Sequence, residues 1–380
     1  MTEIGKTDHL SFKAQWYDLE SSLLKKFILY FFPSDNTIEL FDTKTRKLFL
    51  KRTRCEGITA EHIYVGNTIM VFSRQIVIND YANNVTKEQL EHKMQRTFAL
   101  IKPDGLQNKG NILNILISNH FKIAKLKMVN MTKDDVLEFY SEHKGESFLP
   151  FVVDLLVSAP VIALELMGER GLEKLIKLVG PSDPSVAKTK APSSIRALYG
   201  KDTVKNAIHA SNTIESADKE CNFFFETRCD SPKAIATFTN STCCIVKPHA
   251  FQEGKLGDII KMIEDNNFTV TGMQLFYLEK VNAEEFLEIY KGVVPEYMDM
   301  VQQLISGPCL ALEISGQSND TPIKFRELVG PSDPEIACQI KPKTIRARFG
   351  KNKVENAVHV TDLPEDASLE VEYFFKLLCS

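Results

Sequence analysis

Two histidines in this chain each belong to the same pattern of polar residues. The pattern runs arginine, asparagine, histidine and glutamate, and it occurs twice with identical spacings, 150 residues apart: Arg196, Asn206, His209 and Glu220, then Arg346, Asn356, His359 and Glu370. Between Ile195 and His209 the second copy keeps nine of the fifteen residues. Four polar residue types repeated at one offset indicate two copies of one functional unit.

The residue types in this unit suit phosphoryl transfer. Histidine has a pKa of about 6.5, so near neutral pH much of it is an unprotonated nucleophile that can accept a phosphoryl group and pass it on. Arginine binds phosphate oxygens in a two-point fashion and stays charged. Each copy adds a lysine at the end of an apolar run, Lys102 and Lys247, and the second copy adds Arg326. The alternative of a buried structural histidine stays open for each copy.

Composition excludes several other classes of protein. No G-x-x-x-x-G-K-[ST] segment occurs and no G-x-G-x-x-G follows a strand, so a P-loop or a Rossmann site has little support. A net charge of −4 argues against a nucleic-acid partner. The longest apolar runs, such as Phe27–Phe32, are too short for a membrane span, and the polar start Met1–Leu10 argues against a signal peptide. Eight cysteines without C-x-x-C spacing predict reduced thiols, a cytosolic protein and no zinc site.

The elements that must position these residues fall into three modules. Residues 1–92 contain short β-rich runs separated by turn residues, which predicts a small antiparallel β domain with a helix-prone tail at Thr86–Glu91. The expected strands are Lys26–Phe32, Thr37–Phe41, Lys47–Lys51, Asn67–Val71 and Gln75–Asp80. The two repeats follow at 95–226 and 239–376, joined by the polar stretch Thr227–Phe238, which is typical of a linker.

Each repeat mixes strand and helix periods in the same order. Strands are expected at Thr97–Ile101, Phe121–Val129 and Pro160–Leu166, and again at Thr242–Val246, Phe268–Phe276 and Pro308–Ile314. Helical spacing follows the first strand of each copy, at Asn111–His120 and Leu256–Asp265, and each copy ends in an expected helix, Ile214–Phe225 and Glu365–Leu377. This order predicts an α+β fold, two tandem ferredoxin-like (split βαβ) domains, fused into an intramolecular pair.

The two copies resemble the nucleoside diphosphate kinases. Ile101-Lys-Pro-Asp-Gly is similar to that family's lysine strand, and Asn206-Ala-Ile-His-Ala-Ser is similar to its N-x-x-H-G-S loop. The resemblance covers nearly all of Gln95–Phe375, twice. It implies transfer of the γ-phosphate of a nucleoside triphosphate to a nucleoside diphosphate through a phosphohistidine, with ATP and GTP as substrates. Mg²⁺ would bind mainly through the oxygens of the nucleotide, because no carboxylate cluster suggests a dedicated metal site.

The resemblance also implies roles for single residues. His209 and His359 would be the phosphorylated nucleophiles. The expected phosphate contacts are Lys102, Ser182, Arg196, Lys247, Arg326, Ser332 and Arg346. Asn206 and Asn356 would contact the ribose, Tyr140 and Tyr290 would stand beside the histidines, and Phe148 would stack on the base. The imidazoles would be oriented by Ser211, Glu220, Thr361 and Glu370.

Both copies depart from the family pattern. The first has Ile176 where the family has a phosphate-binding arginine, and Ala210 where it has glycine. The second has His249 and Ala250 in place of aspartate and glycine, and its loop before Pro308 is two residues shorter. Loss of one phosphate-binding arginine would weaken binding by about 1.5–3 kcal/mol. The overall pattern favours the first copy as the more competent of the two.

The first module resembles the DM-ten domain of ciliary proteins. The resemblance is carried by Phe49-Leu-Lys-Arg-Thr, Tyr64-Val-Gly-Asn and Phe72-Ser-Arg-Gln-Ile-Val-Ile-Asn-Asp-Tyr. It implies a location in the cytoplasm on the cytoskeleton, at the axoneme of the cilium, with tubulin and other axonemal proteins as partners. An acid-free basic cluster is either a solvated strand face or a docking surface for an acidic partner such as tubulin: Lys44, Arg46, Lys47, Lys51, Arg52 and Arg54.

Two rivals to the enzyme stay open. A structural microtubule-associated protein would keep the lobes as folded units with weak or absent turnover, and the eroded positions favour it. The intact Asn-x-x-His segments and lysine strands oppose it. The third possibility is a nucleotide-binding sensor that transfers no phosphate.

Overall fold

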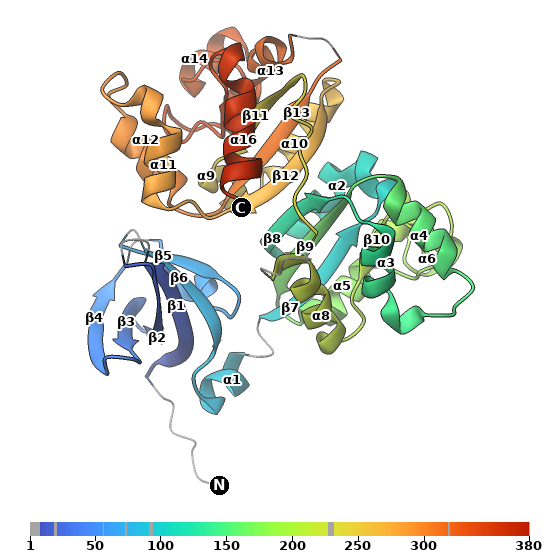
Figure 1. The fold of residues 1–380 in the computed structure, drawn as a ribbon, viewed down its shortest axis with the longest axis horizontal. Helices are drawn as coiled ribbons and strands as arrows, with labels where there is room; N and C mark the ends of the chain where they lie inside the picture. Colours follow the sequence, from blue (N-terminus) through green and yellow to red (C-terminus); the bar gives the residue numbers. More distant parts are fainter. Residues whose placement is uncertain are drawn as a thin grey trace.

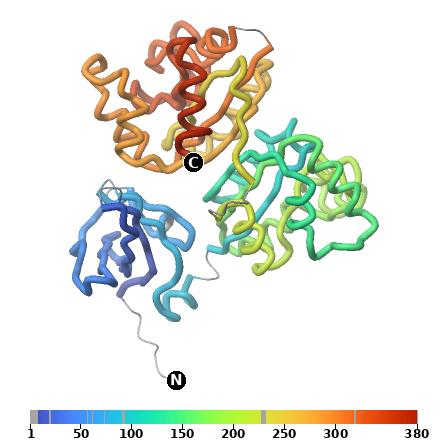
Figure 2. The backbone as a smooth tube through the Cα atoms, viewed as in Figure 1, coloured from blue at the N-terminus to red at the C-terminus, as the bar shows by residue number. Residues whose placement is uncertain are grey.

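A computed structural model of the protein describes residues 8–18, 21–55, 57–72, 74–90, 94–226, 232–317 and 320–379. The chain forms one β module and two α+β lobes, which follow one another from blue through green to red (Figures 1 and 2). The first and second lobes contain the first and second copies of the polar pattern. Within the described ranges, no helix combines the length and the apolar character that crossing a bilayer requires.

Six antiparallel strands form the sheet of the N-terminal module, in the order β4-β3-β2-β1-β6-β5. They are β1 (Leu10–Asp18), β2 (Leu23–Phe32), β3 (Thr37–Asp42), β4 (Lys47–Arg54), β5 (Thr68–Val71) and β6 (Arg74–Tyr81). The turn and strand pattern predicts all of these except β1, which pairs with both β2 and β6. Phe12 and Ala14 alternate inward from β1 into the core, a period of two that marks the strand. A short helix, α1 (Asn84–Leu90), contains the predicted helical tail from Thr86 to Leu90, and Glu91 lies outside the described residues.

The two lobes share one eight-stranded antiparallel sheet, in the order β10-β7-β9-β8-β12-β13-β11-β14. The first lobe contributes β7 (Gln95–Ile101), β8 (Lys122–Val129), β9 (Val161–Gly168) and β10 (Ile208–Ala210). The second contributes β11 (Ser241–Val246), β12 (Thr269–Phe276), β13 (Cys309–Ser315) and β14 (Val358–Val360). The second half repeats the first in mirror order, and the halves join where Gln274 pairs with Lys127. The predicted split βαβ fold and the intramolecular pairing are confirmed.

Helices of the first lobe are α2 (Lys109–Ser118), α3 (Lys133–Phe139), α4 (Leu149–Ser158), α5 (Gly171–Val179), α6 (Pro184–Lys190), α7 (Ile195–Tyr199) and α8 (Ile214–Phe225). Those of the second are α9 (Pro248–Gln252), α10 (Leu256–Asp265), α11 (Lys280–Phe286), α12 (Tyr297–Leu304), α13 (Thr321–Val329), α14 (Pro334–Ile340), α15 (Ile345–Phe349) and α16 (Ala367–Glu372). Helices α8 and α16 pack on β7 and β11 as expected, with Phe224 and Phe374 fully buried. The last predicted helix is divided: a 3-10 turn precedes α16, and a π-helical turn, Tyr373–Leu377, follows it.

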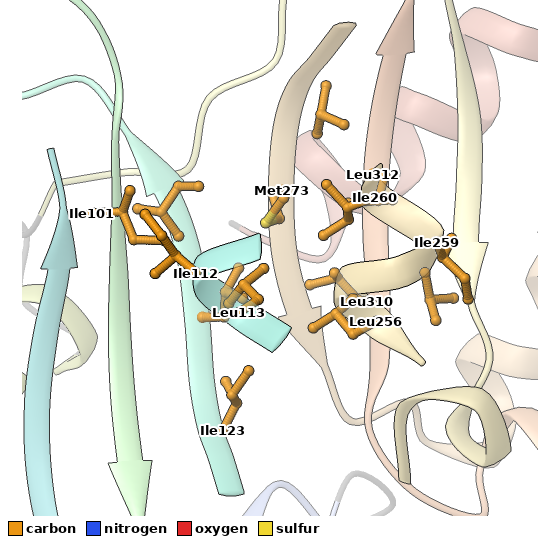
Figure 3. Close-up of a cluster of buried hydrophobic side chains, with 14 of the residues drawn as sticks. Ile101, Ile112, Leu113, Ile123, Leu256, Ile259, Ile260, Met273, Leu310 and Leu312 are labelled. Carbon is orange, nitrogen blue, oxygen red and sulfur yellow. The ribbon is translucent and has the colours of Figure 1, made fainter. Parts of the chain in front are cut away.

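Helices α2 and α10 hold the lobes together. Their buried side chains belong to one hydrophobic core that extends through both lobes, and it includes Ile112 and Leu113 of α2 and Ile259 and Ile260 of α10 (Figure 3). The helices approach closely because glycine faces glycine: a Cβ on Gly110 would lie 2.9 Å from the carbonyl oxygen of Gly257. Polar contacts flank the crossing, an ion pair of Lys109 with Glu264 and a hydrogen bond from Asn114 to Asp258 (2.7 Å).

The segment between the lobes docks onto the protein along its described part. Residues 227–231 of the predicted linker lie outside the described residues. Beyond them, Ile235 N–H donates to the Met128 carbonyl (3.1 Å), and the buried Glu313 carboxylate accepts from the backbone of Thr237 (2.7 Å) and Phe238 (2.6 Å). The N-terminal module is also anchored, since Gln75 Nε2 donates to the Tyr277 carbonyl of the second lobe (2.7 Å). The three modules therefore form one packed body.

Candidate active site

The pairing of two short strands with two long ones brings the predicted site residues together. His209 on β10 lies opposite Leu100 on β7, and His359 on β14 lies opposite Ile245 on β11. Lys102 and Lys247 end the long strands, and their backbone N–H groups donate to the carbonyls of Ala207 (2.9 Å) and Ala357 (3.0 Å). Each lysine is thereby fixed beside the Asn-x-x-His loop, more than a hundred residues away in the sequence.

The alanines in these loops adopt a backbone conformation that the sequence does not reveal. Ala207 and Ala357 have φ angles of 68° and 70°. A residue with a side chain rarely takes this left-handed conformation, because its Cβ approaches the following carbonyl. Both copies keep it, and it turns the chain between the asparagine and the histidine so that both side chains belong to one site.

A glutamate orients each histidine. The distance from His209 Nε2 to Glu220 Oε1 is 2.9 Å, and that from His359 Nε2 to Glu370 Oε2 is 3.0 Å. Ser211 and Thr361 donate to the same two carboxylates, as the sequence predicts. A carboxylate only accepts hydrogen bonds, so Nε2 carries the proton of the neutral ring, and Nδ1 then keeps its lone pair for chemistry.

Aromatic rings complete the surroundings of the histidines. Phe139 and Phe286 end α3 and α11 and present their edges at 5.4 and 4.9 Å, between ring centroids, from His209 and His359. Neither phenylalanine is among the residues predicted from the sequence. Both phenylalanines are the last residue of the helix after the second strand of their lobe, and this repeated position could have predicted them.

The two predicted tyrosines reach the histidines from different positions. Tyr140 follows α3 directly, and its hydroxyl lies 3.5 Å from His209 Nδ1. In the second lobe Leu287 follows α11, and Tyr290 ends the next turn, where the first lobe has His143. The Tyr290 ring centroid is 6.5 Å from that of His359, and its hydroxyl donates to Asp362. Tyr140 and Tyr290 are 150 residues apart, as the two histidines are, but they do not occupy equivalent positions in the two lobes.

One lysine and one arginine stand beside each Asn-x-x-His loop: Lys102 and Arg196 in the first lobe, Lys247 and Arg346 in the second. Three of them are buried, and Arg196 is half-buried. Burial lowers the pKa of Lys102 to about 8 and that of Lys247 to about 7, with the neighbouring arginine as the second cause. Burial likewise lowers the pKa of Arg196 and of Arg346 to about 10. No carboxylate in the described ranges forms an ion pair with any of the four, so an anion would relieve an unbalanced positive charge.

Each arginine is held in place by backbone carbonyls. Arg196 donates to the carbonyls of Ile208 (3.1 Å) and Gly180 (2.8 Å), and Arg346 makes the matching bonds to Val358 (3.2 Å) and Gly330 (3.0 Å). Gly180 is required at this point, because its φ is 81° and a Cβ there would lie 2.3 Å from Ser194 Oγ. The guanidinium is therefore preorganised, with N–H groups left for a ligand.

The predicted ribose ligands are engaged with the protein. Asn206 Nδ2 donates to the Ser182 carbonyl (2.9 Å), and Asn206 Oδ1 accepts from Lys102 Nζ (2.8 Å). Asn356 Nδ2 makes the same bond to Ser332 (2.9 Å), whereas Lys247 Nζ donates to the Val354 carbonyl (2.8 Å). Asn356 Oδ1 is buried and has no partner among the described residues. The asparagine oxygen of the second lobe is therefore available to a ligand, whereas that of the first lobe accepts from Lys102. Ribose binding by both asparagines stays a prediction.

A cavity of about 710 Å³ opens over the second lobe. It collects every nucleotide-binding residue predicted for that copy, together with its histidine: Lys247, Tyr290, Arg326, Ser332, Arg346, Asn356, His359 and Thr361. A smaller cavity of about 120 Å³ borders Tyr140, His209 and Glu220 in the first lobe, and Lys102 and Arg196 do not line it. The geometry favours the second lobe, whereas the sequence departures favour the first. Which lobe is competent stays a prediction.

Phe148, the residue predicted to stack on the base, lies beside His143 in the first lobe. Its ring lies 5.5 Å from that of His143, edge to face, and it packs against the core beneath α4. It does not line the cavity beside His209. Stacking of a base on Phe148 stays a prediction.

Arg326 and its partner show how the two lobes differ. Arg326 forms an ion pair with Asp362 (3.0 Å), which also accepts from Tyr290. The equivalent residues of the first lobe are Ile176 and Asn212, so both charges are missing together. Because the arginine and the aspartate are replaced together, the first lobe has no aspartate that lacks its ion-pair partner at this position. The sequence predicts the arginine but not its ion pair with Asp362.

Comparison with known proteins agrees with this arrangement. The family model for nucleoside diphosphate kinase matches residues 95–229 and 240–378, and the model for the DM10 domain matches residues 4–85. A nucleoside diphosphate kinase homolog 7 of Rattus norvegicus is 45% identical over 376 residues, covering 98% of this chain and 94% of that protein. The Mus musculus protein of the same name is 46% identical over 380 residues, covering 100% and 95%. A crystal structure of Aquifex aeolicus nucleoside diphosphate kinase is 39% identical, covering 35% of this chain and 96% of that one, with a TM-score of 0.35. The chain belongs to the nucleoside diphosphate kinase family and carries a DM10 domain in front of two kinase-type lobes.

Proposed function

We infer that the protein moves the γ-phosphate of a nucleoside triphosphate to a nucleoside diphosphate through a histidine. One observation carries this proposal: His359 lines the 710 Å³ cavity together with Lys247 and Arg346, while its Nε2 is held by Glu370 at 3.0 Å. The ring is fixed, Nδ1 of the neutral ring carries the lone pair, and Lys247 and Arg346 form no ion pair with the described residues. Phosphoryl transfer needs little more than such positioning and charge.

In the first half-reaction, the Nδ1 lone pair forms a bond to the γ-phosphorus. The bond between that phosphorus and the bridging oxygen breaks, and its electron pair leaves with the diphosphate. Glu370 stabilises the positive charge that develops on the ring, and Lys247 and Arg346 balance the charge on the phosphoryl oxygens. A second nucleoside diphosphate then takes the phosphoryl group by the reverse of these steps, which is nearly isoenergetic because both bonds are phosphoanhydrides.

Magnesium fits this site as a companion of the nucleotide. In the described ranges no group of three or more His, Cys, Asp or Glu side chains is arranged to hold a metal. Asp362, a carboxylate on the cavity wall, is engaged by Arg326 and Tyr290, so the oxygens of the nucleotide would supply the ligands. The bound ion would neutralise charge on the phosphate chain.

A labelling experiment tests the proposal. The full chain is incubated with γ-labelled ATP, and acid-labile label is measured before and after addition of GDP. We expect label on histidine that moves to GTP. His209→Ala and His359→Ala assign the label to one lobe. Nucleotide binding without label would indicate a sensor, and absence of both would indicate a structural protein and overturn the proposal.

For the N-terminal module, we propose docking on microtubules in the cytoskeleton of the cilium. Strand β4 lies at the edge of its sheet, on the side of the module away from the first lobe (Figure 1). It exposes Lys47, Lys51 and Arg54. A basic edge of this kind suits the acidic surface of tubulin. Salt-sensitive co-pelleting with microtubules is the expected result, and salt-independent or absent co-pelleting would contradict it.

A further inference from the structure

The two lobes anchor the Asn-x-x-His loop through different side chains at one position. In the first lobe, Asp104 Oδ2 accepts the backbone N–H of Ala207 at 2.8 Å. In the second lobe, His249 stands two residues after the lysine in the same way, and its Nε2 accepts the backbone N–H of Ala357 at 3.2 Å. His249 therefore replaces the aspartate as a hydrogen-bond acceptor. It is a substitution that preserves the anchor.

The anchoring bond fixes the protonation of His249. A backbone N–H can only donate, so Nε2 must present its lone pair, and the single ring proton of a neutral imidazole lies on Nδ1. The atom placed 3.0 Å from Nδ1 is Gln303 Nε2, which cannot pair with a ring N–H, so the side-chain amide is assigned with its oxygen and nitrogen exchanged. An N–H on the ring requires the amide oxygen there, and this orientation also satisfies Gln303 Oε1, which is otherwise a buried acceptor without a partner. Burial lowers the pKa of His249 to about 4, which agrees with a neutral ring.

The exchange removes a negative charge next to the phosphate-binding lysine. Asp104 raises the pKa of Lys102, whereas His249 supplies no such charge to Lys247. Asp202, the other carboxylate that acts on Lys102, is Asn352 in the second lobe. Glu355 is the remaining carboxylate that acts on Lys247, and Glu253 is already paired with Lys351.

We propose that His249 is a positioning residue that sets the charge preference of the second cavity, making it favour triphosphates over diphosphates more strongly than an aspartate would. This inference rests on the proposed function, since it concerns the phosphate end of the same site. A triphosphate carries about one more negative charge than a diphosphate. Across a separation on the order of 10 Å and an effective dielectric constant of about 20 to 40, one carboxylate at position 249 would change the preference about four- to sixteen-fold.

The chain offers a matched pair of variants. His249→Asp and His249→Asn have the same size, and each can accept the Ala357 N–H, but only the first adds a charge. Ile323 is exposed and lines the second cavity, and the chain has one tryptophan, Trp16. Ile323→Trp in a Trp16→Phe background therefore reports ligand binding in the second lobe alone. ADP and a non-hydrolysable ATP analogue are titrated in EDTA at low ionic strength.

The result expected is a ratio of triphosphate to diphosphate affinity that falls about four- to sixteen-fold in His249→Asp and stays within about twofold of wild type in His249→Asn. Equal ratios in the two variants would overturn the proposal while leaving nucleotide binding intact. His249→Ala lacks the anchor and should weaken both ligands without changing their ratio. If neither nucleotide binds, the proposed function fails, and tripolyphosphate against pyrophosphate still decides the charge preference. Thermal unfolding of each variant checks that the second lobe stays folded.

Discussion

His359 and Thr361 share one oxygen of the Glu370 carboxylate, at 3.0 and 2.8 Å. In the first lobe, His209 and Ser211 take separate oxygens of Glu220. Both arrangements use the carboxylate to hold Nε2–H, which directs the nucleophilic Nδ1 away from the glutamate. The glutamate is thus the residue on which the ring's tautomer and orientation depend.

Replacing this glutamate should slow phosphorylation without unfolding the lobe. Glu370→Gln in a His209→Ala background removes the negative charge beside the ring but keeps the side-chain size. A hydrogen bond to a charged group is worth about 1.5–3 kcal/mol, so label transfer to His359 should fall about ten- to a hundredfold. Single-turnover labelling with γ-labelled ATP measures the rate. Thr361→Val is the control for loss of the hydroxyl alone, and an unchanged rate in Glu370→Gln would contradict the assigned role.

The Arg326–Asp362 pair should behave as a unit. Arg326→Ile copies the first lobe but leaves Asp362 unpaired beside the phosphate site, so nucleotide affinity should fall about ten- to a hundredfold. Arg326→Ile with Asp362→Asn copies both changes and should recover part of that loss. Titration of nucleotide into wild type, both single variants and the double variant gives the coupling between the two positions. Additive losses would show that the aspartate does not matter to the arginine's function.

Acid should destabilise the second lobe through His249. Its pKa is lowered to about 4 by burial, with Lys247 and Lys351 opposing protonation and Glu355 and Glu253 favouring it. Below an unfolded-state pKa of about 6.5 the unfolded chain takes up a proton that the folded lobe does not, so the stability present above that pH is lost as the pH falls toward 4. Between pH 6.5 and 5 the free energy of unfolding should fall by about 1–2 kcal/mol more in wild type than in His249→Asn. Urea unfolding at several pH values measures it, and parallel curves would contradict it.

The basic edge of the N-terminal module is narrower than the sequence suggests. Arg52 forms an ion pair with Asp35 (2.6 Å) and lies 3.8 Å from the centre of the Phe32 ring, so it serves the module's own fold. Charge reversal at Lys47, Lys51 and Arg54 should therefore weaken microtubule co-pelleting several-fold at low salt, with little effect at high salt. Reversal at Lys133, Lys188 and Lys190, all exposed on the first lobe, is the charge-matched control. Equal losses in both sets would indicate a general charge effect.

Repetition within the sequence predicts much of this protein. Equal spacing of arginine, asparagine, histidine and glutamate in two copies identifies the polar machinery, and alternation of strand and helix periods identifies the fold of each lobe. Strand β1 escapes prediction because its buried face is marked by few residues, such as Phe12 and Ala14, next to polar neighbours. Tyr290 is misplaced for another reason: an equal offset in sequence hides a shift in structure wherever the loops differ in length.

The sequence alone determined which residue types each lobe contributes to its candidate phosphate site, because the same types occur in the same order in both copies. The tertiary structure decided how they are used. Pairing of β7 with β10 and of β11 with β14 places each lysine beside its histidine, and the backbone carbonyls that hold Arg196 and Arg346 come from distant loops. The role of His249 depends on a single N–H from Ala357, 108 residues away. Such contacts join residues that are far apart in the sequence and that come within hydrogen-bond distance only when the chain folds.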